Sequence, residues 1–262
     1  MPELPDLEVF KDNIYHRLTS KRLESVQVYN QQKVTAPQYM LTQDLYNRNL
    51  AAINRFGKEL LFDFGDSRII AVHLMLSGRI TIINDISDAE NIKYKILSLN
   101  FERESIIFSD MGGLCTIKYK PVVGGVPDAL SRDFTLEYFR DISRKKANMN
   151  IKAFLINQKI VKGIGNAYVD EILWRARISP RSKVGKIPDE VMVDLYNAIN
   201  TVLKEAIVSI KSIAPDIISG EERSFLQVHN KSKKKTETGF PIIIERIASK
   251  TTYFTEEQIL YL

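Results

Sequence analysis

The chain has 262 residues, of which 44% are apolar and 26% charged, and its formal net charge is +5. This is the usual balance of a globular protein with one large or two small domains, without a bilayer-spanning run of ~18 apolar residues and without the basic start and apolar core of a signal peptide. The single cysteine, Cys115, excludes an intramolecular disulfide framework and a cysteine-cluster zinc site, so we expect a reducing, cytoplasmic setting.

The positive charge is concentrated in the second half of the chain. Residues 1–131 contain 15 Lys+Arg and 16 Asp+Glu, a net charge of −1, and the remaining residues contain 22 and 16, a net charge of +6. This asymmetry predicts that the second half meets a polyanion. The densest cluster, Lys231, Lys233, Lys234 and Lys235, is equally typical of a solvated loop.

The N-terminal part of the chain is expected to form a helix followed by a β-rich region. Residues 6–19 place Leu7, Phe10, Ile14 and Leu18 at helical spacing after two prolines. Short β-branched runs separated by turn signals follow, and they predict an antiparallel sandwich or barrel. These runs are 23–29, 50–56, 59–64, 68–76, 79–83, 94–101 and 105–110.

The second half has mainly helical periodicity and a β-type tail. The expected helices are 135–142, 147–158, 165–177, 188–210 and 212–219, and the expected strands are 225–229, 240–248 and 251–255. The predicted division is an N-terminal β-sandwich domain at 1–121, a linker at 122–131, a helical domain at 132–222 and a β-hairpin segment at 223–262.

Pro2 and Glu3 are candidate catalytic residues because of their position at the start of the sequence. If the initiator methionine is removed, Pro2 presents a free secondary amine, and an α-amino group titrates near pH ~8, so a useful fraction is neutral and can attack a carbon electrophile. The resulting iminium acidifies neighbouring C–H bonds, and Glu3 could serve as general acid or base. The alternative is that the pair simply starts the first helix.

Each of the other candidate site residues also has a purely structural interpretation. Lys58 is also consistent with a solvated strand edge, and His73, among apolar neighbours, with a buried and satisfied histidine. Residues 163–166 (GIGN) open a predicted helix, whose exposed N–H groups bind phosphate well, and Lys162 precedes them. Helix–helix turns use glycine for other reasons too.

Four segments together resemble one enzyme family. They are MPELPDLE at 1–8, FGKELLF at 56–62, HLMLSG at 73–78 and the long run from Ala153 to Pro180, AFLINQKIVKGIGNAYVDEILWRARISP. In order and spacing they resemble the formamidopyrimidine-DNA glycosylase / endonuclease VIII family, over nearly the whole chain. The long run is similar to that family's helix–two-turn–helix element.

The resemblance implies an α+β fold: an N-terminal helix with an antiparallel β-sandwich, then a helix–two-turn–helix DNA-binding domain that ends in a β-hairpin finger. It implies a base-excision repair enzyme that flips the damaged base out of duplex DNA. Such an enzyme removes oxidised bases, either formamidopyrimidine-type purines or oxidised pyrimidines, and cleaves the abasic strand by β,δ-elimination. The implied partner is duplex DNA with damaged bases or abasic sites.

Residue roles follow from the same resemblance. Pro2 would attack C1′ of the damaged nucleotide, and Glu3 would protonate the sugar ring oxygen. Lys58 and Asn166 would hold phosphates near the lesion, and His73 would lie beside the extruded nucleotide. The remaining matched residues are Lys162 among the DNA-binding positions, and Glu8 and Glu171 among the acidic positions near the active site.

The chain departs from the family pattern at three places. The tail has no cysteine where the family usually has a four-cysteine zinc finger, which predicts a zincless hairpin, and Lys250 stands where the family has a finger arginine. Asp6 replaces a glutamate. Where the family fills the gap left by the flipped base with Met, Arg and Phe, this chain offers Met75, Leu76, Gly113 and Leu114. Without the arginine, hydrogen-bond readout of an opposing cytosine is lost.

No metal or organic cofactor is expected, and neither is a membrane partner. We expect a monomer in the cytoplasm, associated with the nucleoid if the source is bacterial. Two alternatives remain open: a DNA-binding relative that is catalytically inactive or only an abasic-site lyase, and an unrelated binding module on the same fold.

Overall fold

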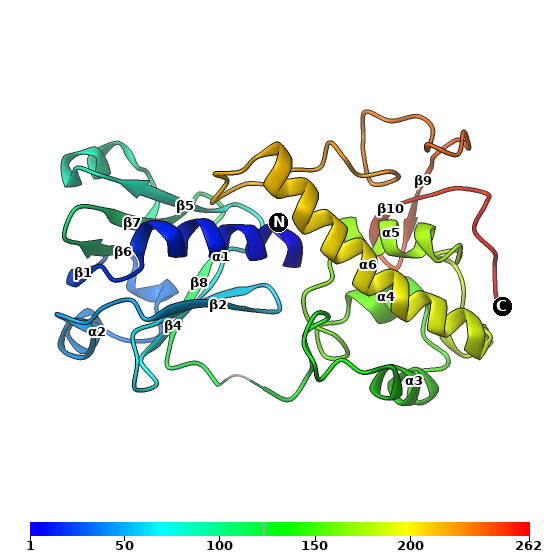
Figure 1. Cartoon of the computed structure of the whole chain (residues 1–262), viewed down its shortest axis with the longest axis horizontal. Helices are drawn as coiled ribbons and strands as arrows, with labels where there is room; N and C mark the ends of the chain where they lie inside the picture. Colours follow the sequence, from blue (N-terminus) through cyan, green and yellow to red (C-terminus); the bar gives the residue numbers. More distant parts are fainter. Residues whose placement is uncertain (123) are drawn as a thin grey trace. The chain divides into compact units, whose positions relative to one another are not determined.

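The computed structural model describes residues 1–122 and 124–262, with only the backbone of Ile86, and Figure 1 traces their elements. They form two compact units. The first comprises Met1–Pro2, Asp6–Val123 and Lys211–Glu221, and the second Glu3–Pro5, Gly124–Ile210 and Glu222–Leu262. The four-part division at 121, 131 and 222 stays a prediction.

The first unit is built on two antiparallel four-stranded sheets, as the β-branched runs predict. One has the order β1-β6-β7-β5 and the other β2-β3-β4-β8. The strands are β1 (Leu23–Val28), β2 (Ala52–Phe56), β3 (Glu59–Asp63), β4 (Ile69–His73), β5 (Gly78–Ile83), β6 (Lys95–Phe101), β7 (Ser105–Asp110) and β8 (Thr116–Tyr119). Phe62 of β3 meets Phe108 of β7 edge to face at 5.5 Å, so the sheets share one apolar core.

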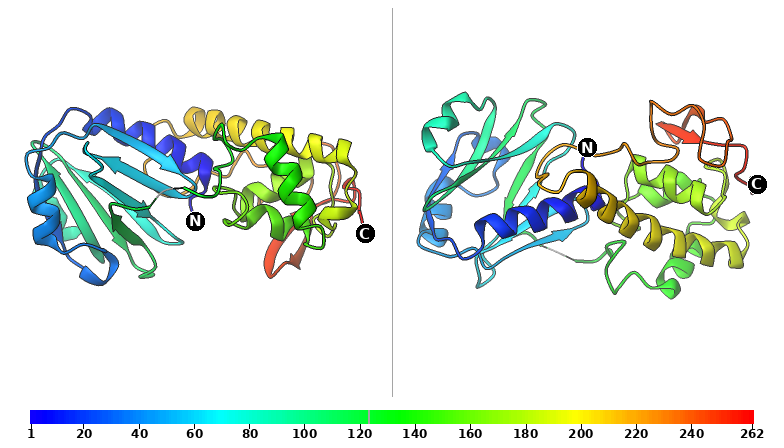
Figure 2. Two further views of the ribbon diagram at one scale, coloured as in Figure 1. Left: turned by 90° about the horizontal axis from the view of Figure 1, so that it is seen from below. Right: turned by 45° about the horizontal axis from the view of Figure 1, so that its top comes forward.

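The predicted first helix is α1 (Leu4–Leu18), which lies along the two sheets in Figures 1 and 2. Its four apolar residues at helical spacing, Leu7, Phe10, Ile14 and Leu18, are fully buried in that core. A short helix α2 (Gln38–Leu45), the strand β8 and the 3₁₀ turns Gln31–Lys33, Ile86–Asn91 and Val184–Lys186 were not predicted. Segments this short give too few periods for a pattern to be recognised.

Four helices form the body of the second unit: α3 (Leu136–Lys145), α4 (Ile151–Ile156), α5 (Asn166–Arg175) and α6 (Asp189–Ile213). They correspond to the first four predicted helices of this half. A separate helix at 212–219 was wrong. Helix α6 continues to Ile213, and the chain then turns because Pro215 disfavours helical backbone at Ala214.

The chain closes with the hairpin β9 (Ile243–Ile247) and β10 (Lys250–Phe254). The connecting residues Ala248 and Ser249 have φ of +49° and +61°, the left-handed pair of a two-residue hairpin turn. The predicted strand at 225–229 was wrong. The N–H groups of Gln227, Val228 and His229 bind a carboxylate of α5 instead of a neighbouring strand.

No helix in the described part of the chain has the length and apolar character needed to cross a membrane.

Candidate functional site

Glu3 takes the place of a helix cap. Its carboxylate is only 3% exposed and accepts hydrogen bonds from the backbone N–H groups of Gly165 (2.8 Å), Ala167 (2.9 Å) and Tyr168 (3.3 Å), at the start of α5. The cap residue of α5 is Gly165, whose lack of a side chain leaves these donors without a local partner. A negative charge at this end also complements the helix dipole. The residue that follows Pro2 is therefore fixed by three bonds.

The turn before α5 is shaped to receive the same N-terminal segment. Gly163 has φ +101°, and a Cβ added there would lie 2.5 Å from Leu4 Cδ1. The Leu4 N–H donates to the Gly163 carbonyl at 3.2 Å. Asn166 begins α5 as predicted, and its side-chain amide donates to the Thr251 carbonyl of β10 at 2.9 Å. Glycine is thus needed at 163 for both conformation and space.

A fully buried lysine joins three elements beneath this turn. Lys152 Nζ of α4 lies 2.7 Å from Asp170 Oδ1 of α5 and 2.7 Å from Thr252 Oγ1 of β10. The other Asp170 oxygen bonds His229 Nδ1 at 2.7 Å and the Tyr253 N–H at 3.0 Å. Burial lowers the pKa of Lys152, and the Asp170 charge opposes that shift. This network attaches the hairpin to the helices.

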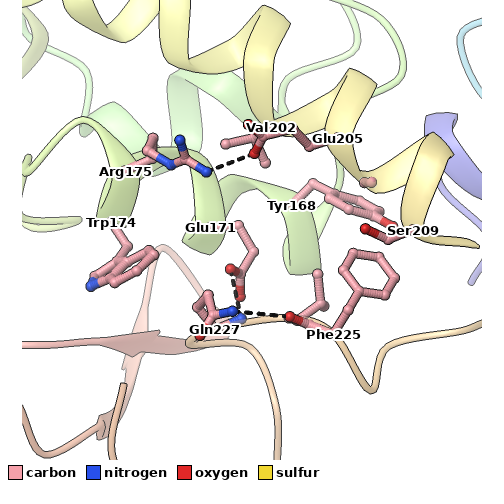
Figure 3. Close-up of a pocket in the computed structure, with 11 residues that line it drawn as sticks. Tyr168, Glu171, Trp174, Arg175, Val202, Glu205, Ser209, Phe225 and Gln227 are labelled. Carbon is pink, nitrogen blue, oxygen red and sulfur yellow. Dashed lines mark hydrogen bonds and ion pairs between the residues drawn. The ribbon is translucent and has the colours of Figure 1, made fainter. Parts of the chain in front are cut away.

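Glu171 lies at the next position of α5 and is also buried. Burial raises the pKa of its carboxyl group, against three backbone N–H groups that donate to it from residues 227–229. Figure 3 shows Glu171 pointing toward Gln227 at the floor of a pocket of about 240 Å³. Trp174 and Phe225 stand on opposite sides of the pocket, and Arg175 pairs with Glu205 at its rim. Glu171 therefore anchors the segment that leads to the Lys-rich loop.

In the first unit Lys58 follows Gly57 in the turn between β2 and β3, and it is only 9% exposed. It is therefore not the solvated edge residue that was one alternative. Nearby in sequence, the Arg55 side chain is 6% exposed, and its Nε donates a hydrogen bond to Glu8 Oε2 of α1 at 2.7 Å. Asp6, on the first turn of α1, is fully buried.

His73 ends β4 and accepts a hydrogen bond at Nδ1 from the Met75 N–H at 3.1 Å. Burial lowers its pKa, so the ring is kept neutral. Met75 has φ +54°, which turns the chain so that the next side chain, Leu76, is 66% exposed. The loop after β7 behaves similarly: Gly113 has φ +64° and Leu114 is 44% exposed.

Pro2 is buried and lines a depression of about 390 Å³ in the first unit. The N-terminal ammonium of Met1 pairs with Glu221 there. The full lining is Pro2, Leu76, Ser77, Gly78, Arg79, Lys93, Tyr94, Ser109, Met111, Gly220 and Glu221. Two cationic side chains, Arg79 and Lys93, therefore line the same depression as Pro2.

Two family models match the chain, one for each half. Residues 1–117 match the formamidopyrimidine-DNA glycosylase N-terminal domain, and residues 126–216 match the formamidopyrimidine-DNA glycosylase H2TH domain. A formamidopyrimidine-DNA glycosylase of Lactobacillus delbrueckii subsp. bulgaricus is 30% identical over 79% of this chain and 78% of its own length.

The chain belongs to the formamidopyrimidine-DNA glycosylase family. Another member, from Lactococcus lactis subsp. cremoris, is 28% identical over 97% of both chains. A solved Lactococcus lactis Fpg in complex with DNA containing an abasic site has a TM-score of 0.84 and 25% identity, over 97% of this chain and 98% of that one. A second, with DNA containing an oxidised pyrimidine, has a TM-score of 0.84 and 26% identity, over the same shares of the two chains.

The family residues expected from the sequence fall into two sets. Pro2, Asp6, Glu8, Lys58, His73, Met75, Leu76, Gly113 and Leu114 lie in the first unit, and Glu3, Lys162, Asn166, Glu171 and Lys250 in the second. Lys162 is half-buried, its backbone N–H donates to the Pro127 carbonyl, and Lys250 is exposed at the start of β10.

Sequence reasoning missed two residues that organise the site. They are Lys152 and Asp170, on the two faces of α4 and α5 that meet. Both stand within the segment that resembles the family motif or next to it. A lysine in an otherwise apolar helix was the available signal, since buried charges are almost always paired.

Proposed function

We propose that this family member is a base-excision repair DNA glycosylase with abasic-site lyase activity, acting on oxidised bases in duplex DNA through the amine of Pro2. The observation that carries this is Glu3: its three bonds to the start of α5 fix the residue that follows the nucleophile. Family membership supports the same reaction, and the solved relatives bound to damaged DNA support the substrate class.

The proposed chemistry starts with Pro2 freed of Met1. Its nitrogen bonds C1′ as the C1′–base bond breaks, and the base leaves with that electron pair. The Pro2 nitrogen then loses its N–H proton, which passes through the Glu3 carboxylate to the sugar ring oxygen; the C1′–O bond breaks, the ring opens, and an iminium remains between Pro2 and C1′. The iminium acidifies C2′–H, whose loss expels the 3′ phosphate (β-elimination), and a second elimination expels the 5′ phosphate.

Phosphate and groove contacts are assigned by the same proposal. Lys58, Lys162, Asn166 and Lys250 would contact phosphates, His73 would lie beside the extruded nucleotide, and Met75, Leu76, Gly113 and Leu114 would face the gap in the stack. Asp6 and Glu171, which are buried, and Glu8, which is half-buried, would support the site. The neutral His73 ring suits a hydrogen-bonding role near DNA.

We also propose that the hairpin needs no zinc. Glu257 Oε2 accepts hydrogen bonds from Trp174 Nε1 (3.2 Å), Thr238 Oγ1 (2.9 Å) and Thr255 Oγ1 (3.1 Å). These donors come from α5, from the loop before β9 and from the residue after β10. One carboxylate thus joins three chain segments, the task that thiolate-bound zinc performs elsewhere.

A second candidate is a DNA-binding relative without base release. The loop 110–115 favours it, because Gly113 and Leu114 offer no side-chain donor that could read an opposing base. Such a protein would bind damaged duplex in a salt-dependent manner and would leave the base in place.

The deciding experiment is borohydride trapping with protein whose intact mass shows that Met1 is absent. We expect a covalent adduct with abasic duplex, mapped by peptide mass spectrometry to Pro2, and a much weaker adduct for Pro2→Gly. A panel of lesion duplexes, scored separately for base release and strand cleavage, separates the two candidates. Adducts mapped to an internal lysine would contradict the proposal. We further expect a cytoplasmic monomer.

A further inference from the structure

Two adjoining segments of the second unit carry a group of cations. The Gly185 N–H donates to the Ala147 carbonyl at 2.8 Å, and the Val184 N–H donates to the Met149 carbonyl at 3.0 Å. The turn Val184–Lys186 therefore lies against the residues that follow α3. The cations of these two segments, which we call the α3 basic patch, are Arg140, Arg144, Lys145, Lys146, Lys183 and Lys186.

The lysines of the α3 basic patch are exposed, and none forms an ion pair with a residue in the described part of the chain. Arg144 pairs with Asp141 at 3.6 Å, but both side chains are mostly exposed, so this pair contributes little and can exchange for another. A cation at the end of a helix complements its dipole, which accounts for Lys145. Lys186 stands three residues before α6, where the dipole disfavours a cation, so helix stability does not account for it.

A pocket of about 270 Å³ opens among these cations. Its apolar lining residues, Val184, Ile187 and Met192, are buried, and Ser143 Oγ already donates to the Phe139 carbonyl at 2.7 Å. The charged lining residues are more exposed. The full lining is Arg140, Ser143, Arg144, Val184, Gly185, Ile187, Asp189 and Met192. The pocket thus combines an apolar interior with a charged rim.

One ion pair of the rim shows which anion suits it. Arg140 binds the Asp189 carboxylate through Nε at 3.0 Å and through Nη2 at 2.5 Å. This is the two-bond geometry in which a guanidinium group recognises a carboxylate. Arg144, whose own pair is loose, can offer the same fork to a carboxylate from outside.

The combination of cations and an apolar interior favours a peptide over a nucleic acid backbone. A duplex backbone presents phosphates without an apolar side chain, whereas an acidic peptide presents carboxylates and can place an apolar residue between them. The α3 helix and the β9–β10 hairpin lie on opposite sides of the second unit in Figure 1. A peptide bound at α3 would therefore leave the hairpin free.

We propose that the α3 basic patch and its pocket bind an acidic peptide segment of a partner protein. Aspartate or glutamate carboxylates of the segment pair with Arg144, Lys186 and the neighbouring lysines, and one apolar side chain enters the pocket above Val184 and Met192. The charges steer and orient the segment, and the apolar contact selects it from other acidic chains.

The test measures the fluorescence anisotropy of a labelled poly-aspartate peptide with one central leucine, titrated with the full chain. Alanine in place of that leucine should weaken binding about fivefold, because the apolar contact is lost. Arg144→Glu with Lys186→Glu should weaken binding about tenfold. Lys231→Glu with Lys235→Glu makes the same change of charge in the Lys-rich loop and should stay within about twofold, since distant exposed charges are screened.

A milder variant and a second ligand complete the test. Lys145→Ala with Lys186→Ala keeps the Arg144 pair and should weaken peptide binding about threefold, with an unchanged circular dichroism spectrum. No binding to the wild-type chain, equal binding of the leucine and alanine peptides, or equal losses in the two charge-reversed variants would overturn the proposal.

Two other occupants give different results. If undamaged duplex DNA loses affinity for the Arg144→Glu, Lys186→Glu variant while the peptide does not, the patch binds nucleic acid and the proposal is wrong. A changed gel-filtration volume with unchanged peptide affinity would assign the patch to a second copy of the chain and also overturn it. The peptide assay involves no chemistry at Pro2, so its outcome is independent of the proposed function.

Discussion

The Glu3 carboxylate performs two tasks with one set of hydrogen bonds. It satisfies N–H donors that α5 cannot satisfy itself, and it fixes the N-terminal segment beside Pro2. Both tasks need an acceptor with several lone pairs, which a carboxylate has and an amide has only in part.

Glu3→Gln should therefore lower the melting temperature. The amide would turn an N–H₂ group toward backbone N–H donors, and an unsatisfied buried donor costs ~1–3 kcal/mol, or about 3–10 °C in a chain of this size. Differential scanning calorimetry measures the shift. Glu3→Asp, which keeps the charge but is one methylene shorter, should lose less. An unchanged melting temperature in Glu3→Gln would show that this contact does not stabilise α5.

At the scale of elements, the hairpin depends on Glu257 and on its own turn. Burial raises the pKa of Glu257, but hydrogen bonds from Thr238, Trp174 and Thr255 outweigh it, so the pKa lies below its usual value. A carboxyl group with a lowered folded-state pKa stabilises the fold above its unfolded-state pKa. That contribution is lost as the pH falls through the folded-state pKa.

Trp174 is the only tryptophan of the chain, so its emission reports this bond directly. A pH titration of the emission should show a step below pH 4.5, the ordinary value for a glutamate. Glu257→Gln should abolish the step, while Glu256→Gln, at the exposed neighbouring position, should keep it. Circular dichroism over the same range separates the step from global unfolding. A step that survives Glu257→Gln would contradict the assignment.

A substitution in the hairpin turn should make the hairpin more stable. Ala248 and Ser249 occupy left-handed conformations that cost a non-glycine residue roughly 1–2 kcal/mol each. Ser249→Gly should therefore slow hydrogen exchange of the hairpin amides without altering the pairing of Ile247 with Lys250. Ser249→Val should accelerate exchange, because a β-branched residue is strained further there. Equal exchange in both variants would show that this turn does not limit hairpin opening.

At the scale of the whole molecule, part of the excess positive charge of the second half lies in one loop. The Lys-rich loop at 231–235 follows directly after the segment that Glu171 anchors. Lys231, Lys234 and Lys235 are exposed and make no side-chain bond to any described residue. Free lysines on an anchored loop suit phosphate contacts better than a mobile tail would.

Replacing Lys231, Lys234 and Lys235 by alanine should reduce the salt dependence of DNA binding. Each lost phosphate contact lowers the slope of log K against log salt by about 0.9. Fluorescence anisotropy at several salt concentrations measures the slope. Lys118→Ala removes a lysine that already pairs with Glu59, and the slope should stay unchanged. A wild-type slope in the triple variant would show that these three lysines do not contact the DNA phosphates.

Periodicity in the sequence was sufficient to predict α1, α5 and most strands, because a buried face repeats along each of them. It failed at 225–229, where an alternating pattern belongs to a segment bound to Glu171 rather than to a sheet. It also could not pair Lys152 with Asp170, since the partner of a buried charge depends on how separate helices pack. The donors of Glu257 come from three segments and left no local signal.

The loop after β7 holds two sulfur atoms with opposite accessibility. Cys115 is fully buried, and burial raises the pKa of its thiol to about 12, so it is poorly reactive, whereas Met111 is 75% exposed. An oxidant that damages DNA should therefore spare the thiol and convert Met111 into a polar sulfoxide. Mild peroxide should oxidise Met111 first and Met40, which is 40% exposed, more slowly, while Cys115 stays reduced, as peptide mass spectrometry would measure. Oxidising conditions would then change the surface of this loop and leave its core intact.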